Sequence, residues 1–167
     1  MFRRMVFLPV VLLTMPFLAS CGEEEDSLAM LSVEFAVEDQ FGVEEASFVK
    51  GDTANLVFTL RNKGSSSITV YYTPPMENAI ARRVADDSIV WDYNYGKFFI
   101  QAFVSFEIPA GSEERVVIPW DFSATPELAD DVPAGLYDIE PDFSVQDKGG
   151  SSFVTLDADD AVRVSLQ

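Results

Sequence analysis

Between Ile100 and Trp120 the sequence reads IQAFVSFEIPAGSEERVVIPW, and this stretch decides the fold class. Apolar residues alternate with other residues on both sides of Pro109-Ala110-Gly111: Ile100, Ala102, Val104, Phe106 and Ile108 before it, and Val116, Ile118 and Trp120 after it. A period of two is typical of a strand with one buried face. Proline presets a turn and glycine accepts a positive φ, so the stretch predicts a hairpin of two strands.

The same alternation continues outward in both directions, whereas helical periodicity is almost absent. We expect a second hairpin around Asp86-Asp87-Ser88, a loop at Pro74-Pro75 where backbone donors are missing, and closing strands near 152–156 and 161–166. About eight or nine short strands result. Antiparallel sheets with one apolar face must cover that face, so the pattern predicts an all-β, two-sheet antiparallel sandwich over residues 31–167.

The first twenty residues have a different character. Arg3 and Arg4 precede an apolar stretch that ends in Leu18-Ala19-Ser20. This layout is typical of a secretory signal peptide, and the stretch is shorter than the roughly 20 apolar residues of a membrane-spanning helix. We therefore expect residues 1–20 to be removed.

Cys21 follows immediately and is the only cysteine in the chain. Leu18-Ala19-Ser20-Cys21 resembles the lipobox of bacterial lipoproteins, which implies acylation of Cys21 and a membrane anchor without a spanning helix. The alternative is a secreted protein with a chance cysteine. Residues 21–30, which include Glu23-Glu24-Glu25-Asp26, read as an acidic tether or as a surface-export signal. We expect a lipid-anchored protein of the bacterial cell envelope. Gly22 favours the outer membrane if the host is Gram-negative.

Composition excludes several classes of function. The formal net charge is −17, and a surface this acidic repels nucleic acid. The chain has no histidine, which removes the usual general base and the Ser-His-Asp, Cys-His and His-metal sites. Asp157, Asp159 and Asp160 lack the glycine and glutamate of a calcium loop, so we read them as a solvated turn. We therefore expect no enzymatic activity, catalytic residue, metal site or cofactor.

Three stretches carry a resemblance to a known family. They are Ile89-Val90-Trp91 with Phe98-Phe99; Ile108-Pro109-Ala110-Gly111-Ser112-Glu113; and Trp120-Asp121 followed by Val132-Pro133-Ala134-Gly135-Leu136-Tyr137. In order and spacing they resemble the BsuPI-type intracellular proteinase inhibitor domain, as does the strand ending at Asn62. The resemblance implies an immunoglobulin-like β-sandwich and inhibition of a serine protease. Rings, prolines and glycines at the matching positions fit a structural role, in the core or in turns.

The expected function is that of a non-enzymatic binding protein anchored through Cys21. Its partner would be a protease of the envelope or the extracellular space, since an exported chain does not meet a cytoplasmic one, or another envelope protein. We place the docking loop at Tyr72–Asn78, where Pro74, Pro75 and Met76 would present a preorganised surface.

An alternative function is carbohydrate binding, for which Tyr93 and Tyr95 beside Trp91 would form a stacking surface. The opposing interpretation is that Trp91 belongs to the core and the tyrosines flank a hairpin. A structural envelope lipoprotein without a discrete ligand is a third hypothesis.

Overall fold

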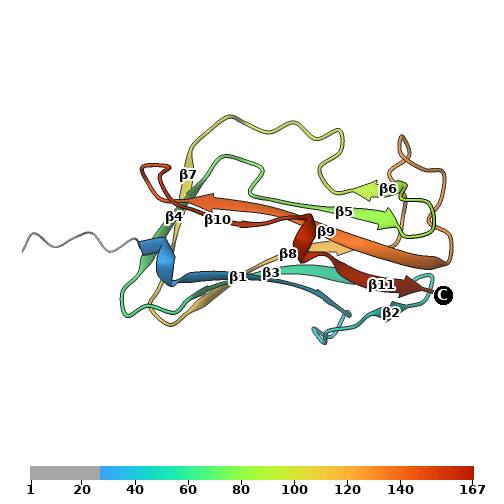
Figure 1. Ribbon diagram of the computed structural model, residues 1–167, viewed down its shortest axis with the longest axis horizontal. Helices are drawn as coiled ribbons and strands as arrows, with labels where there is room; N and C mark the ends of the chain where they lie inside the picture. The colour runs from blue at the N-terminus through green and yellow to red at the C-terminus, as the bar shows by residue number, and fades with distance from the viewer. Residues whose placement is uncertain (1–26) are drawn as a thin grey trace, which may run out of the picture.

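The computed structural model describes residues 27–167. Over that range the chain is nearly all β, with eleven strands in two sheets and two short 3-10 helices. In Figure 1 the strands β1 and β3 run below the long strand β9, so the two sheets form the layers of a sandwich. The predicted sandwich is confirmed, with eleven strands in place of eight or nine. The expected signal peptide and Cys21 lie outside the described residues.

The small sheet has three antiparallel strands in the order β1-β3-β8. These strands are β1 (Leu31–Glu38), β3 (Ala54–Asn62) and β8 (Glu113–Trp120). The central strand β3 is the most buried of the three, because neighbours cover both of its edges and the other sheet covers one face.

The large sheet is built around β9 (Gly135–Gln146). Its other strands are β2 (Ser47–Phe48), β4 (Ile68–Tyr72), β5 (Glu77–Arg83), β6 (Ile89–Asp92), β7 (Val104–Ile108), β10 (Phe153–Leu156) and β11 (Val162–Leu166). β9 pairs with β5 and then β4 along one edge, and with β11 and then β10 along the other. Every pairing is antiparallel except that of β11 with β2.

The predicted hairpin across Pro109-Ala110-Gly111 is wrong. β7 pairs with β4 in the large sheet, whereas β8 pairs with β3 in the small sheet, so the chain crosses between the layers at this turn. Both strands turn an apolar face toward the same interior, where Ile108 and Ile118 are buried. Apolar residues therefore alternate in the same way whether the two strands form a hairpin or lie in different sheets. The strand also begins only at Val104.

Other sequence predictions are confirmed. β5 and β6 form the antiparallel hairpin expected around Asp86-Asp87-Ser88, with an irregular register between Ala81 and Arg82. The chain between β4 and β5 is a loop at Pro74-Pro75, and the chain closes with β10 and β11.

The start of the domain lies earlier than residue 31. Residues Ser27–Met30 form the first 3-10 helix, η1, and the side chain of Leu28 is buried in the core. The last residues of the expected tether therefore belong to the folded body. Among residues 27–167, no helix has the length and apolar character needed to cross a membrane.

Aromatic rings fill the interior of the sandwich next to the hairpin of β5 and β6. The ring of Trp120 stacks on Trp91 with centroids 5.3 Å apart, and it also contacts Phe122 and Tyr137. Trp91 is therefore a core residue, as one of the two interpretations had it. The buried hydroxyl of Tyr137 donates a hydrogen bond to the carbonyl oxygen of Pro133, four residues upstream. A tyrosine bonded back to the preceding corner is a hallmark of immunoglobulin-like sandwiches.

Asn62 joins the two layers where the chain crosses between them. Its side chain is fully buried at the end of β3. Its amide nitrogen donates to the carbonyl oxygens of Ser66, Ile108 and Pro109 at 2.8, 3.0 and 3.2 Å. Its amide oxygen accepts from the backbone N–H of Gly64 at 2.8 Å. One side chain thus pairs with backbone groups of two connections, the one between β3 and β4 and the one between β7 and β8.

We predict that Asn62→Ala destabilises the domain by about 3 kcal/mol, because burying several unpaired backbone groups costs about 1–3 kcal/mol for each. The free energy of unfolding in urea measures the loss. Arg61→Ala, at the position next to Asn62, is the matched control. The Arg61 side chain forms an exposed ion pair with Glu113, which contributes less than about 1 kcal/mol. Similar losses for both variants would contradict the role assigned to Asn62.

Candidate protein-binding site

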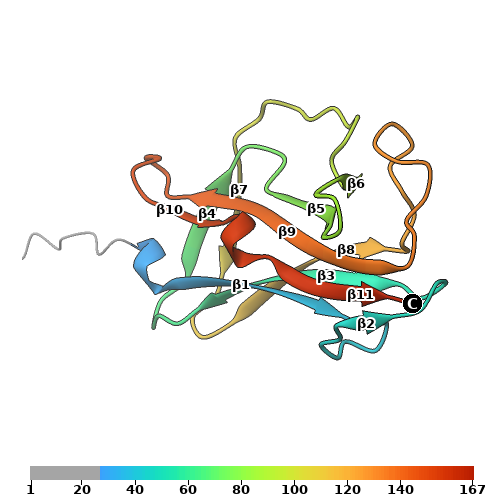
Figure 2. The same cartoon turned by 45° about the vertical axis from the view of Figure 1, so that its right-hand side comes forward.

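Two connections that the sequence singled out lie next to each other. The proline loop, residues 73–76, joins β4 to β5, and the apolar connection, residues 93–103, joins β6 to β7. Because β4 pairs with β7 and β5 pairs with β6, the ends of the two connections lie on paired strands. In Figures 1 and 2 the two arch over the same side of the large sheet.

Asn94 holds the two connections together. Its side-chain nitrogen donates to the carbonyl oxygen of Glu77 at 2.8 Å, and its backbone N–H donates to the side-chain oxygen of Asn78 at 3.1 Å. The backbone N–H of Tyr93 adds a bond to the carbonyl oxygen of Ala79 at 3.0 Å. The segment after the proline loop and the start of the apolar connection are therefore fixed to each other.

Within the proline loop, the three residues proposed for docking differ in exposure. Pro75 is exposed and Pro74 is half-buried, but Met76 is only 8% exposed and lies in the core. The backbone N–H of Ser144 on β9 donates to the carbonyl oxygen of Met76 at 3.0 Å. Met76 therefore anchors the loop to the sheet, and Pro75 is the part of it that a partner can reach.

The two tyrosines also differ. The ammonium group of Lys97 lies 3.1 Å from the ring centroid of Tyr93, a cation–π contact that covers one face of this half-buried ring. Tyr95 is 45% exposed, and Trp91 is buried. Only Tyr95 therefore presents an open ring, so the three aromatics do not form the broad stacking surface considered for a sugar ligand.

The apolar connection carries exposed residues that the sequence interpretation assigned to the interior. Phe98 is fully exposed, Ile100 is 71% exposed, and Phe103 is about half exposed. Ile100 was expected on the buried face of a strand, and Phe98 in a structural role. Both expectations are wrong, because no strand pairs with residues 97–103 and the side chains of Phe98 and Ile100 lie uncovered. An apolar run has the same appearance in a sequence whether or not a sheet lies over it.

The end of this connection is packed on the large sheet. The ring of Phe103 stacks on Tyr71 of β4 with centroids 5.3 Å apart and planes inclined by 15°. The next residue, Val104, already pairs with Tyr72. The connection is therefore held at its start by Asn94 and at its end by the contact between Phe103 and Tyr71.

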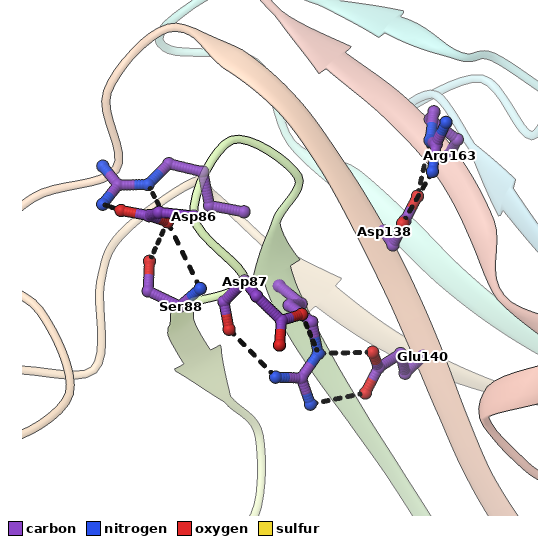
Figure 3. Close-up of polar contacts among 8 residues, drawn as sticks. Asp86, Asp87, Ser88, Asp138, Glu140 and Arg163 are labelled. Atoms are coloured by element: carbon purple, nitrogen blue, oxygen red, sulfur yellow. Dashed lines mark hydrogen bonds and ion pairs between the residues drawn. The ribbon is translucent and has the colours of Figure 1, made fainter.

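Ion pairs fix the hairpin that supports this site, as Figure 3 shows. Arg82 on β5 forms two bonds to Glu140 on β9, at 2.6 and 3.2 Å. Arg83 binds Asp86 in the turn, and this contact holds the pKa of the Asp86 carboxyl well below its usual range. Arg163 lowers the pKa of Asp138 in the same way. These arginines face acidic partners on the domain itself, which indicates a structural role.

The acidic clusters do not form a metal site in the part of the chain that the structure describes. Asp157 and Asp160 cap the turn of the second 3-10 helix, η2 (Ala158–Asp160), as the sequence predicted for a turn before the last strand. A hollow of about 220 Å³ near β2 is bordered by Asp39, Glu45 and Asp52. Each of these carboxylates already accepts hydrogen bonds from nearby backbone N–H groups.

The fold and the site define a β-sandwich that carries an exposed apolar connection beside the proline loop. The family model of BsuPI, the intracellular proteinase inhibitors, matches residues 41–148. The chain belongs to this family. The resemblance noted in the sequence is thereby confirmed, whereas the lipoprotein context remains a prediction. No curated protein matches the chain.

Solved structures share only a distant likeness. The DNA glycosylase AlkC of Pseudomonas fluorescens is 12% identical with a TM-score of 0.42, and the match covers 83% of this chain and 30% of the glycosylase. A β-glucosidase of Listeria innocua is 13% identical with a TM-score of 0.42, over 81% of this chain and 16% of the enzyme. The C-terminal domain of wzt is 9% identical with a TM-score of 0.43, and the match covers 83% of this chain and 74% of that domain. The first two are therefore much longer than the region that matches. None of these values supports a transfer of function.

A carboxylate next to the site has a perturbed pKa. Burial removes water from Glu77 and raises the pKa of its carboxyl, although its own backbone N–H and the charge of Lys97 act in the opposite direction. The folded state thus favours the protonated form. Between the ordinary pKa and the raised one the folded state binds more protons than the unfolded state, so Glu77 reduces stability as the pH rises through that window.

We predict that Glu77→Gln raises the melting temperature at pH 7 and that this gain disappears below about pH 4.5, the ordinary pKa of the group. Thermal unfolding followed by circular dichroism at both pH values measures it. Glu107→Gln, at an exposed position on β7, removes the same charge and corrects for the lower net charge of the variant. Equal gains for the two variants would show that the burial of Glu77 has no effect on stability.

Proposed function

We propose that this protein is a lipid-anchored, non-enzymatic inhibitor that binds a protease of the cell envelope or the extracellular space. The observation that carries the proposal is the exposure of Phe98 and Ile100 on the apolar connection of a domain from a proteinase inhibitor family. Soluble proteins rarely leave contiguous large apolar groups in water unless a partner covers them. The binding surface consists of the apolar connection and Pro75 of the proline loop.

The rigidity of this surface supports an inhibitory role. Binding costs less free energy when the contacting segment is already ordered, because fewer conformations are lost. Asn94 and the stack of Phe103 on Tyr71 order the connection at both ends. A protease–inhibitor interface buries about 800 Å² on each partner, so the two connections would form the centre of such an interface.

The chemistry of the chain supports binding without catalysis. It contains no histidine, and its only cysteine is Cys21. A nucleophile–base pair of the Ser-His or Cys-His type therefore cannot form within it. The protein would inhibit its target by binding to it and blocking access of substrates.

The sequence features before residue 22 support an exported location. An apolar stretch ending in Leu18-Ala19-Ser20 precedes Cys21, and an acylated Cys21 would hold the domain at the membrane. The protease bound there would be one that shares the envelope or acts outside it. The founding activity of the family would then be directed at a different target.

We expect the full-length chain, purified in detergent and immobilised, to retain a protease from solubilised envelopes and to suppress its activity in proportion to the amount added. Replacing Phe98 and Ile100 by aspartate should weaken this inhibition at least about 30-fold, because central apolar anchors each contribute about 2 kcal/mol or more. Mass spectrometry identifies the protease, and a peptide-hydrolysis assay measures its activity.

The matched control replaces Phe41 and Val43, which are similarly exposed on the connection between β1 and β2, by aspartate. This variant has the same change in charge and should inhibit like the parent chain. If neither the parent chain nor the control reduces any protease activity, the inhibitor proposal is wrong.

The anchor has its own test. We expect the parent chain to sediment with membranes and to incorporate labelled palmitate, and Cys21→Ser to lose the label and the lipid-dependent association. Ultracentrifugation and fluorography measure the two properties. Retention of the label by Cys21→Ser would place the acylation elsewhere and contradict the anchor.

A further inference from the structure

We propose that Phe98 fills the primary specificity pocket of the target protease while residues 98–102 lie along its active-site cleft as an extended strand. The target is then a protease whose primary pocket accepts a large apolar side chain. This inference rests on the proposed inhibitory function and specifies the segment and the class of protease.

The backbone of this segment is free to pair with a partner. Residues 97–103 belong to no helix or strand, and residues 98–102 make no backbone hydrogen bond within residues 27–167. Extended segments bind other proteins by adding a strand to an exposed edge, where main-chain hydrogen bonds supply affinity. The unpaired N–H and C=O groups of residues 98–102 meet that requirement without the loss of any internal bond.

The side chains point to an apolar pocket. Phe98 and Ile100 are the two most exposed large apolar residues of the connection, and they are two positions apart, on the same side of an extended chain. No charged residue occurs from Phe98 to Phe106. The nearest cation, Lys97, lies over the ring of Tyr93. A pocket with a carboxylate at its base, as in trypsin, would therefore find no partner here, whereas an apolar slot would accept Phe98.

The ends of the segment keep it in place. The backbone N–H of Lys97 donates to the carbonyl oxygen of Asn94 at 3.1 Å, and Asn94 is itself bonded to the chain at Glu77. After the segment, Phe103 stacks on Tyr71 and β7 begins. A short segment held at both ends has fewer conformations than a free chain, which lowers the entropic cost of docking.

Other exposed phenylalanines lack this combination. The backbone N–H of Phe41 donates to the side-chain oxygen of Asp39 at 2.8 Å, and Phe153 is paired with Gln146 in the large sheet. Their rings are exposed, but their backbones are engaged. The apolar connection is thus the segment, among the described residues, that offers exposed rings and an unpaired backbone together.

The test uses the full-length chain in detergent against four purified proteases: subtilisin and chymotrypsin, which accept large apolar side chains, trypsin, which requires a cation, and elastase, which accepts small residues. We expect inhibition of subtilisin, chymotrypsin or both. Phe98→Ala should raise the inhibition constant about 10- to 100-fold, in line with the burial of one phenylalanine ring. Phe98→Lys should lose the same inhibition and gain inhibition of trypsin.

Phe41→Ala serves as the matched control and should leave every inhibition constant unchanged. Unfolding midpoints in urea that equal that of the parent chain will show that the variants are folded, since the Phe98 ring contributes nothing to the core. Inhibition by the parent chain that survives both Phe98→Ala and Phe98→Lys, or inhibition confined to trypsin or elastase, overturns this inference and leaves the inhibitor proposal standing.

Two further outcomes count against the inference. Sedimentation equilibrium that shows a dimer in the parent chain and a monomer in Phe98→Ala, with equal inhibition by both, would assign the segment to a contact between copies of this chain. A parent chain that inhibits neither these four enzymes nor any protease recovered from envelopes overturns the inhibitor proposal and this inference together.

Discussion

The arrangement of the two sheets depends on the buried amide of Asn62. The chain leaves the large sheet after β7 and enters the small sheet at β8, and the carbonyl oxygens of Ile108 and Pro109 at this crossing accept hydrogen bonds from Asn62. Water cannot reach all of these groups, so a side chain must supply the donors. Asn62 does so from the end of β3. The same amide donates to Ser66 in the connection between β3 and β4, so it ties that connection to the end of β7.

The sequence predicted the strands better than it predicted their partners. Alternation of apolar residues identified β7 and β8, because a period of two depends only on which face is buried. It did not separate a hairpin from a crossing between layers, because both bury Ile108 and Ile118 in one interior. The hairpin of β5 and β6 was predictable, since Asp86-Asp87-Ser88 is a short polar turn between two strands. The pairing of β9 with strands far away in the chain has no local signal.

The candidate site was predictable in part for the same reason. Proline and tyrosine drew attention to Pro75 and Tyr95, which are exposed, and the structure brings their two connections together through Asn94. Phe98 and Ile100 were missed. Whether an apolar residue is buried depends on whether another strand covers it, and residues 97–103 pair with no strand of either sheet. Exposure at these residues is a property of the topology and cannot be read from the run itself.

The position of β9 late in the chain has a consequence for how the domain is made. β4 and β5 are complete by residue 83, yet the central strand that covers their edges spans residues 135–146. Loops this long must close before the large sheet gains its main contacts, and such contacts form slowly. In a chain that emerges from a ribosome or crosses a membrane from its N-terminus, β4 can pair with β7 and β5 with β6, but both lack β9 until residue 146 has appeared. Unpaired strand edges favour aggregation, so the edges of β4 and β5 that β9 later covers carry this risk during synthesis.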